Sequence, residues 1–352
     1  MVSFPNPRSR PPYHMHDMIL GQPEYVRETL SRVRRADAAS FLGNPRHLVL
    51  TGCGTSFHAA MYAARVLQAA LGTKAVVEAV HAYDLLHGNA PGEESAVIGV
   101  SHSGSTSTTN RALAVARRSG ARALALCGLP DSPMEEVADH VLVIGSTHDH
   151  SWANTMSYTT QLTAFAWLAS QVGGEGGAEV GTEIGTLPAR IQKTLGCEAA
   201  VKRLAKRVAA RDRVTFLGTS LDDITALEAA LKIRETCSLP ASGYHVEQFL
   251  HGPFLSLDRR ESVVALRSLD DGERETTILK GLAKTGATVT TVGEAKGVDV
   301  PLPRAHRMLR PILSVVPMQF LAYHAAVEKK ANPDIMRSDV ARYQAGLEPL
   351  FH

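Results

Sequence analysis

The sequence predicts an α/β protein made of two tandem, doubly wound parallel-sheet domains, each a three-layer α/β/α sandwich. Short β-branched and aliphatic runs alternate with helical segments along the 352-residue chain, which is typical of βαβ units. The sequence Gly-Thr-Ser follows the first predicted strand at residues 54–56 and recurs after a later one at residues 218–220. A glycine-rich stretch, residues 172–181, separates the two occurrences. We therefore expect an internal duplication of one α/β topology.

The first half opens with an irregular segment over residues 1–20. A helix over about 22–39 follows, with Pro23 near its start, where the missing N–H has no intrahelical partner. The strands are short and apolar enough to be buried on both faces. They are expected at residues 47–50, 75–79, 96–100, 121–127 and 141–144, with helices at 58–71, 108–119 and 159–171.

The second half repeats this pattern after a connection that we expect to be flexible because of its glycine content. A helix is expected at 187–211, strands at 214–217, 262–266 and 288–292, and further helices at 274–285 and 317–331. The predicted domains are an N-terminal arm and helix at 1–35, a first domain at 36–185 and a second domain at 186–352.

Composition and charge exclude several classes of protein. The net charge is only +2, from 37 basic and 35 acidic residues, so no nucleic-acid surface is expected. No apolar run reaches about 18 residues, so no membrane span is expected. The chain start does not resemble a signal peptide, and four cysteines without a CxxC pair fit a reducing cytoplasm. Histidine pairs at 14/16 and 148/150 lack further ligands, so we expect no metal and no cofactor.

Two hydroxyl-rich loops follow neighbouring predicted strands and open helices. The first provides Gly54, Thr55 and Ser56 as candidate phosphate ligands, and the second provides Ser101, His102, Ser103, Gly104 and Thr106. Backbone N–H groups at a helix start favour an anion, and ligands of open α/β sheets bind outside the carboxyl ends of strands. One such loop would fit a capped turn equally well. The two together favour a phosphate site.

These loops resemble the phosphate-binding pattern of the sugar isomerase (SIS) domain family. Residues 229–235, 251–253 and 311–324 extend the resemblance, in order, to the isomerase module of glucosamine-6-phosphate synthase and to stand-alone SIS aminosugar-phosphate deaminases and deglycases. The resemblance covers nearly the whole chain. It implies a double-SIS, flavodoxin-like fold, a small-molecule sugar phosphate as ligand, and a homodimer whose sites are shared between the chains.

Two residues are candidates for acid/base chemistry. Moving a proton between C1 and C2 of a sugar requires a base such as a carboxylate of raised pKa, and ring opening requires a group such as histidine. Read from the residues alone, Glu235 and His251 are more simply a surface glutamate and a loop histidine. By resemblance, Glu235 is the proton-shuttling base, and His251 is the ring-opening group that reaches into the partner subunit's site.

Two further residues share a helix face with Glu235. Lys232 and Glu228 precede it by three and seven residues. Lys232 would act with Glu235, steadying the open sugar or the phosphate, unless it is a solvated surface lysine. Glu228 is a candidate substrate-binding residue.

Two segments resemble the synthase but lack its lysines. The loop at 153–159, with Asn154 and Thr155 as candidate substrate ligands, lacks one lysine, and the tail lacks the lysine that forms a Schiff base with the ketose. Arg337 and Arg342 lie in the matching part of the tail, and a protonated arginine is not an amine nucleophile.

The tail itself, residues 332–352, is expected to be an ordered lid. Its apolar anchors are Ile335, Val340, Tyr343 and Leu347. Arg337 or Arg342 would supply fixed charge near substrate oxygens. The alternative is a frayed terminus.

These departures argue against amination of fructose 6-phosphate, and we find no segment resembling the synthase's glutaminase domain. Three reactions remain possible: isomerisation, deamination of an aminosugar phosphate, and deglycation of a sugar-amine conjugate. Each would take place at C1/C2 of a ketose or aminosugar 6-phosphate. A sugar-phosphate-binding regulator without turnover is the alternative from another class. The presence of both Glu235 and His251 favours an enzyme, and the identity of the sugar stays open.

Overall fold

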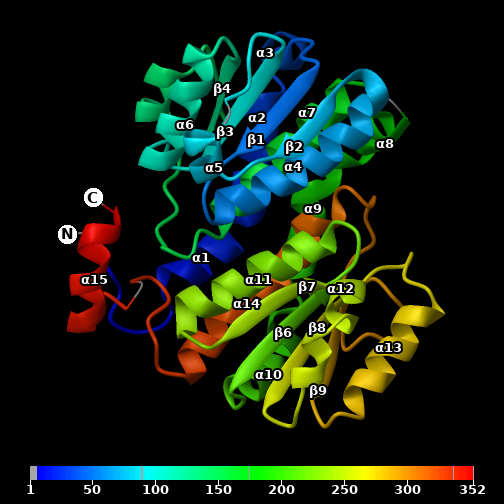
Figure 1. Cartoon of the computed structure of the whole chain (residues 1–352). Coiled ribbons are helices and arrows are strands. Elements are labelled where there is room, and N and C mark those ends of the chain that lie inside the picture. The colour runs from blue at the N-terminus through cyan, green and yellow to red at the C-terminus, as the bar shows by residue number, and fades with distance from the viewer. Residues whose placement is uncertain (1–5, 89, 174, 336, 352) are drawn as a thin grey trace.

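Two parallel five-stranded sheets form the framework of the molecule (Figure 1). The computed structural model describes residues 6–88, 90–173, 175–335 and 337–351. The first sheet contains β1 (His47–Thr51), β2 (Val76–Ala79), β3 (Ser95–Ser101), β4 (Arg122–Cys127) and β5 (His140–Val143). The second contains β6 (Arg213–Gly218), β7 (Ala241–His245), β8 (Glu261–Arg267), β9 (Thr288–Gly293) and β10 (Val300–Pro301).

Both sheets have one strand order, which confirms the predicted fold class and the duplication. The first runs β2-β1-β3-β4-β5 and the second β10-β9-β8-β6-β7. Counted from its own first strand, each is the flavodoxin-like order 2-1-3-4-5. In this order the chain reverses direction across the sheet between the first and third strands, so the loops after β1 and β3 open side by side.

Helices cover both faces of each sheet. The first half contributes α2 (Gln22–Val33), α4 (Thr55–Leu71), α5 (Ala82–His87), α6 (Ser107–Arg118) and α7 (Met156–Gln171). The second contributes α10 (Glu198–Ala209), α11 (Asp222–Cys237), α12 (Val246–Leu250), α13 (Glu273–Ala283) and α14 (Arg310–Glu328). One hydrophobic core is continuous across the inner faces of both sheets, and each outer face has a smaller core. The helices α4 and α11 meet between the sheets, so each half contributes to the space between them (Figure 1).

The glycine-rich connection is helical over most of its length, so the predicted flexible linker is wrong. α8 (Glu175–Glu183) packs against α7, and Val180 and Ile184 are buried there. A Cβ at Gly177 would lie 2.8 Å from the carbonyl oxygen of Ala169, so glycine permits this close approach of two helices. Tertiary packing thus outweighs the low helix propensity of the segment.

Two other boundaries differ from the expectation. The helix predicted at 187–211 is divided into α9 (Leu187–Leu195) and α10, because the chain turns at Gly196. α14 starts seven residues before Pro317, at Arg310, and Pro317 lies inside it. The predicted start was Pro317, whereas Pro311 occupies the first turn of the helix, where proline is favoured. No helix in the described part of the chain is long and apolar enough to cross a membrane.

The second sheet carries its own buried ion pairs where the first carries the hydroxyl-rich loops. Thr219, the counterpart of Thr55, donates a 2.8 Å hydrogen bond to Asp271 in the loop after β8. Arg267 lies 3.5 Å from Asp271 and 3.2 Å from Glu275. Burial and the neighbouring Asp271 raise the pKa of Glu275 to about 8. The chain's own carboxylates thus occupy this edge of the second sheet.

The neutral form of Glu275 makes stability dependent on pH. Folded Glu275 keeps its proton to about pH 8, whereas the unfolded chain releases it near 4.5, the ordinary value. The folded state binds more protons between these values, so the free energy of unfolding falls as pH rises through this window. Glu275→Gln removes this contribution. The difference between the melting temperatures of the variant and the parent should therefore change in favour of the variant by about 2 °C or more from pH 5 to pH 9.

Differential scanning fluorimetry across that pH range measures the effect. Glu273→Gln, an exposed carboxylate on the same helix, is the matched control and should give a constant difference. A Glu275→Gln difference that does not change with pH contradicts the assignment.

Candidate active site

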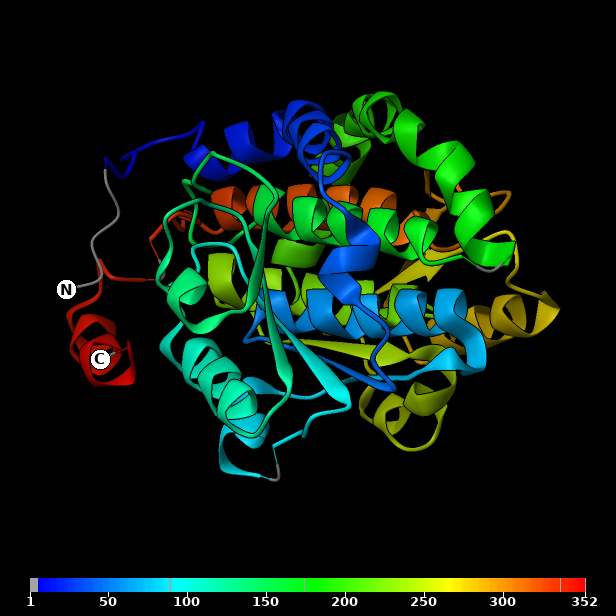
Figure 2. The same cartoon turned by 90° about the horizontal axis from the view of Figure 1, so that it is seen from above.

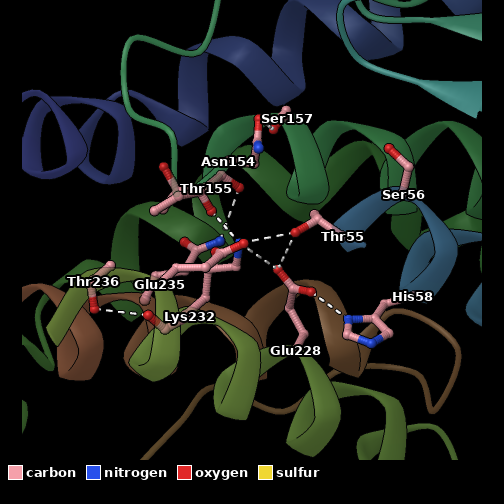
Figure 3. A network of polar contacts seen from close by, with 12 residues as sticks. Thr55, Ser56, His58, Asn154, Thr155, Ser157, Glu228, Lys232, Glu235 and Thr236 are labelled. Atoms are coloured by element: carbon pink, nitrogen blue, oxygen red, sulfur yellow. Dashed lines mark hydrogen bonds and ion pairs between the residues drawn. The ribbon is translucent and has the colours of Figure 1, made fainter. Parts of the chain in front are cut away.

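An array of three charged side chains, two of them buried and Glu235 half-buried, lies on one face of α11 (Figure 3). Lys232 is completely buried, and its Nζ donates to Glu235 Oε2 at 2.6 Å. Its other neighbour is Glu228, whose Oε1 lies 3.3 Å away. The spacings i, i+4 and i, i+3 place both carboxylates beside one ammonium. Lys232 is therefore not the solvated lysine that we considered.

The first half of the chain completes this array through α4. Thr55 Oγ1 accepts a 2.9 Å hydrogen bond from Lys232 and donates one of 3.1 Å to Glu228. His58, one turn later, donates from Nδ1 to the other Glu228 oxygen at 2.6 Å. Gly54, with φ of 55°, precedes the helix in a conformation that favours glycine. The first predicted phosphate loop therefore contacts the predicted catalytic helix directly.

Burial and pairing set the protonation states of the array. Burial alone would raise the pKa of Glu228, but Lys232, His58 and Thr55 bring it below its ordinary value. Burial would lower the pKa of Lys232, and the two carboxylates raise it above the ordinary value instead. For Glu235, burial prevails over the attraction of Lys232, so its pKa is raised. The array therefore holds one firmly ionised carboxylate, one ammonium and one carboxyl group that gains a proton readily.

The loop before α7 packs onto the same lysine. The carbonyl oxygen of Ala153 accepts a hydrogen bond from Lys232. Asn154 has a left-handed φ of 52° and donates to the carbonyl of Trp152 at 2.8 Å. Thr155 is fully buried, and among the described residues its Oγ1 has no hydrogen-bond partner. The two predicted substrate ligands of this loop therefore lie beside the array, as Figure 3 shows.

The second hydroxyl-rich loop is held in shape largely by bonds among its own residues. Ser101 Oγ accepts from the amide of Gly104 at 3.0 Å and lies 3.1 Å from Thr106 Oγ1. Ser103 Oγ lies 2.7 Å from Ser105 Oγ. Gly104 has φ of 63°, and a Cβ there would lie 2.3 Å from Ser132. Ser101 and Gly104 are buried, whereas Ser103 and Thr106 are partly accessible.

His102 and Ser56 are directed to neighbouring loops and helices. The His102 ring packs against Gly128, and its Nε2 accepts from the amide of Asp149 at 3.3 Å. Burial lowers the pKa of His102 to about 4, so the ring is neutral. Ser56 accepts a 3.2 Å hydrogen bond from Gln161 and lies apart from the charged array (Figure 3). Phosphate binding by either side chain stays a prediction.

His251 lies away from the array. It ends α12 and is exposed, as is the adjacent Gly252. His251 lies near Glu247, whose pKa is lowered by Arg274 first and by His251 to a lesser degree. No contact joins His251 to the array within the described part of this chain.

The tail contributes Arg337 to an open cavity beside Glu235. This cavity of about 500 Å³ is lined by Arg234, Glu235, Ser238, Leu239, Pro240, Arg337 and Tyr343. Arg337 donates to Tyr343 Oη at 2.7 Å and stacks on that ring, 3.9 Å from its centre. Arg342 lies 5.3 Å from the same ring centre.

The remainder of the tail forms a helix away from the sheets. α15 (Ala341–Phe351) stands at one end of the molecule in both views (Figure 1, Figure 2). Ile335 and Val340 are half-buried, Tyr343 is 38% exposed, and the side chain of Leu347 lies outside those described. A lid over the array therefore stays a prediction.

An unexpected helix in the N-terminal arm holds the start of the tail. We predicted an irregular segment at 1–20, but α1 (His14–Leu20) is helical because Asp334 caps it. The Asp334 carboxylate accepts from the amides of His14 at 2.8 Å and Met15 at 3.0 Å, and Asp334 is fully buried. The arm thus fixes the tail three residues before Arg337.

Sequence reasoning missed two residues of the site, His58 and Arg234. His58 carried a signal, since it begins the predicted helix three residues after Thr55. Arg234 carried none, because it meets the tail only through the fold, where Tyr343, predicted as an anchor of the tail, lines the same cavity. Among the described residues, no group of three or more metal-ligating side chains is suitably placed to hold an ion.

Residues 41–171 match the family model described as the SIS domain. The glutamine–fructose-6-phosphate aminotransferase [isomerizing] of Symbiobacterium thermophilum is 31% identical over 346 residues, which is 90% of this chain and 56% of that protein. This chain thus spans about half the length of the curated relatives it matches.

Solved structures share the fold over nearly the whole chain. The C-terminal domain of glucosamine-fructose-6-phosphate aminotransferase from Francisella tularensis has a TM-score of 0.83 at 22% identity, covering 92% of this chain and 98% of that one. Glucosamine-6-phosphate deaminase from Thermotoga maritima has a TM-score of 0.77 at 20% identity, covering 92% and 97%.

The array makes Lys232 a strong determinant of stability. Lys232→Met leaves Glu228 and Glu235 without their shared cation in a buried place. Breaking such a pair costs about 3–5 kcal/mol, so the free energy of unfolding should fall by about 3 kcal/mol or more. Urea denaturation measures this. Lys206→Met, which removes a surface lysine 4.0 Å from Glu328, is the control and should cost less than about 1 kcal/mol. Equal costs for the two variants would show that the array is not a buried ion-pair system.

Proposed function

Because the chain contains a SIS domain, we propose that it is an enzyme acting at C1/C2 of a ketose or aminosugar 6-phosphate, by isomerisation or deamination. The observation that carries this proposal is the array of Glu228, Lys232 and Glu235 in contact with Thr55 of the first hydroxyl-rich loop. An acid/base group of raised pKa, a fixed cation and a candidate phosphate loop thus lie together. A protein that only binds a sugar phosphate does not need this combination.

The phosphate would bind at the loops after β1 and β3. Both loops open helices, α4 and α6, at the same edge of the first sheet. Free amide groups at helix starts and side-chain hydroxyls are suitable donors to a phosphate dianion. In the second sheet the corresponding edge is occupied by neutral Glu275 and by ionised Asp271, whose charge repels an anion. We therefore propose one phosphate site per chain.

Glu235 would move the proton between the two carbons. Its raised pKa brings it closer to the pH at which a carboxylate both takes and returns a proton efficiently. The Lys232 ammonium, next to Glu235, would stabilise the negative charge that develops on the enediolate oxygen. Glu228 would keep this lysine charged and in place, because it remains ionised beside it. Arg337 or Arg342 would supply further positive charge from the tail.

Deglycation of a sugar-amine conjugate is the second candidate. It starts with the same proton transfer, after which water adds at C1 and the amine leaves. The cavity beyond Glu235 favours it, since a free hexose phosphate carries no substituent to fill that space.

We further propose a homodimer with shared sites, in the cytoplasm. The exposed loop of His251 carries Leu255, which is 77% exposed, and such a loop is suited to contact a second copy. His251 would reach the site of that copy and open the sugar ring. The division into an arm at 1–35 and domains at 36–185 and 186–352 remains part of this proposal.

Glu235→Gln tests the assigned base. The variant keeps the shape of the side chain and cannot accept the proton, so kcat should fall by about 10²–10⁴-fold. A coupled assay should follow ammonia release, amine release and aldose–ketose interconversion over a panel of hexose and aminosugar 6-phosphates. Thermal stabilisation by the active compound should persist in the variant, and Glu24→Gln, on the exposed face of α2, should behave as the parent. Unchanged turnover in Glu235→Gln would remove Glu235 from its role.

Mixed dimers test whether sites are shared. Glu235→Gln and His251→Ala chains, each inactive alone, should regain part of the activity when unfolded together and refolded as a mixture. The reason is that one of the two sites in a mixed dimer then receives both functional residues. Refolded single-variant samples are the controls. A mixture as inactive as its components, with mixed dimers verified by differential tags, would contradict site sharing.

A further inference from the structure

The cavity beside Glu235 has unpaired positive charge on its walls. Arg234 comes from α11, directly before Glu235, and Arg337 comes from the tail. Arg234 is exposed, and its guanidinium has no hydrogen bond or ion pair within the described part of the chain. Arg337 contacts the Tyr343 ring and hydroxyl, and the described residues give it no carboxylate partner. The only carboxyl group among the lining residues is Glu235, which is already paired with Lys232.

The cavity lies on the side of Glu235 away from the phosphate loops. None of its lining residues comes from the loops at 54–56 or 101–106. Thr55, in contrast, touches Lys232 and Glu228, which are not lining residues of the cavity. In Figure 1 the C-terminal end of α11 points toward the end of the molecule where α15 stands. A substrate with its phosphate at the loops and its reacting carbons at Glu235 would therefore project a C1 substituent into the cavity.

The size and chemistry of the cavity restrict that substituent. About 500 Å³ is within the range of small-molecule pockets, roughly 300–1,000 Å³, and exceeds what a hydrogen or a free amine would fill. Leu239, Pro240 and Tyr343 give it apolar walls. Two guanidinium groups without carboxylate partners are suited to a planar, bidentate anion. A free ammonium at this place would be repelled.

We propose that the substrate is a conjugate of a sugar phosphate with an amino acid, whose carboxylate is bound by Arg234 and Arg337. This inference rests on the proposed function, since it uses Glu235 as the position of the reacting carbons. It selects deglycation, in which Glu235 moves a proton from C1 to C2 to give a C1=N imine and water adds to C1. The C1–N bond then breaks, and the nitrogen of the amino acid leaves with a proton from the added water. No oxidant or reductant takes part. Arg234 is a specificity-determining residue of this reaction.

Two conjugates that differ only in charge test the proposal. The first is fructose 6-phosphate bearing glycine through its nitrogen at C1, and the second bears glycinamide, which has an uncharged amide of equal size. The parent enzyme should have a KM for the glycine conjugate at least 10-fold below that for the glycinamide conjugate. Arg234→Gln should raise the first KM about 10-fold or more and leave the second within about twofold, because charge-assisted hydrogen bonds are lost with only one of them.

Three further variants make the result specific. Arg234→Lys keeps the charge and should restore part of the discrimination. Arg337→Gln should act in the same direction as Arg234→Gln. Arg203→Gln, an exposed arginine on α10 that does not line the cavity, should discriminate between the conjugates as the parent does.

The failures of the two proposals are distinguishable. Carboxylate recognition is overturned if the parent has equal KM values for the two conjugates, or if the Arg234→Gln variant still discriminates between them. In either case, turnover that depends on Glu235 upholds the proposed function. No thermal stabilisation by any sugar phosphate, conjugated or free, overturns both.

Discussion

The buried ammonium of Lys232 is the constraint on which the rest of the site depends. A charge that is completely removed from water must be compensated by neighbouring carboxylates and hydrogen-bond acceptors. Its partners come from three elements: Glu228 and Glu235 from α11, Thr55 from α4, and the Ala153 carbonyl from the loop before α7. Satisfying one lysine therefore fixes how the two halves of the chain meet. The phosphate loop and the catalytic helix are brought together by the same contacts.

The two carboxylates beside Lys232 receive different numbers of hydrogen bonds, and this difference gives them different chemistry. Glu228 receives hydrogen bonds from Thr55 and His58 in addition to the lysine, so its charged form is held below the ordinary pKa. Glu235 has the lysine as its hydrogen-bond partner, and burial raises its pKa. Two groups of one residue type on one helix thus take the roles of a structural anion and a proton acceptor.

The sequence allowed the first sheet, three strands of the second, the two loops and the charged face of α11 to be predicted, because these follow from local periodicity and from motifs in order. The strands β7 and β10 were not predicted. It did not allow contacts between distant segments to be predicted. The cap of α1 by Asp334 joins residues about 320 positions apart, and no local pattern marks it. The segment of α8 was predicted to be a flexible linker because glycine lowers the helix propensity of an isolated segment. In the folded chain, glycine instead allows α8 to pack closely on α7. No sequence pattern marked Arg234 as a candidate site residue, since its proposed role depends on the position of the tail.

The divergence of the two halves has a mechanical reason as well as a chemical one. In the second half, Asp222 at the start of α11 is bound by Arg310 at 2.6 Å and by Ser314 at 2.6 Å, both from α14. The adjacent Asp223 forms bidentate bonds of 2.7 and 2.9 Å with Arg65 of α4. Asp222 and Asp223 therefore anchor the start of α11 to both halves. A helix that must present Glu228, Lys232 and Glu235 within hydrogen-bond distances benefits from such an anchor at its other end. Had the second half kept an open, ligand-dependent loop there, the position of the catalytic helix would have varied with ligand occupancy.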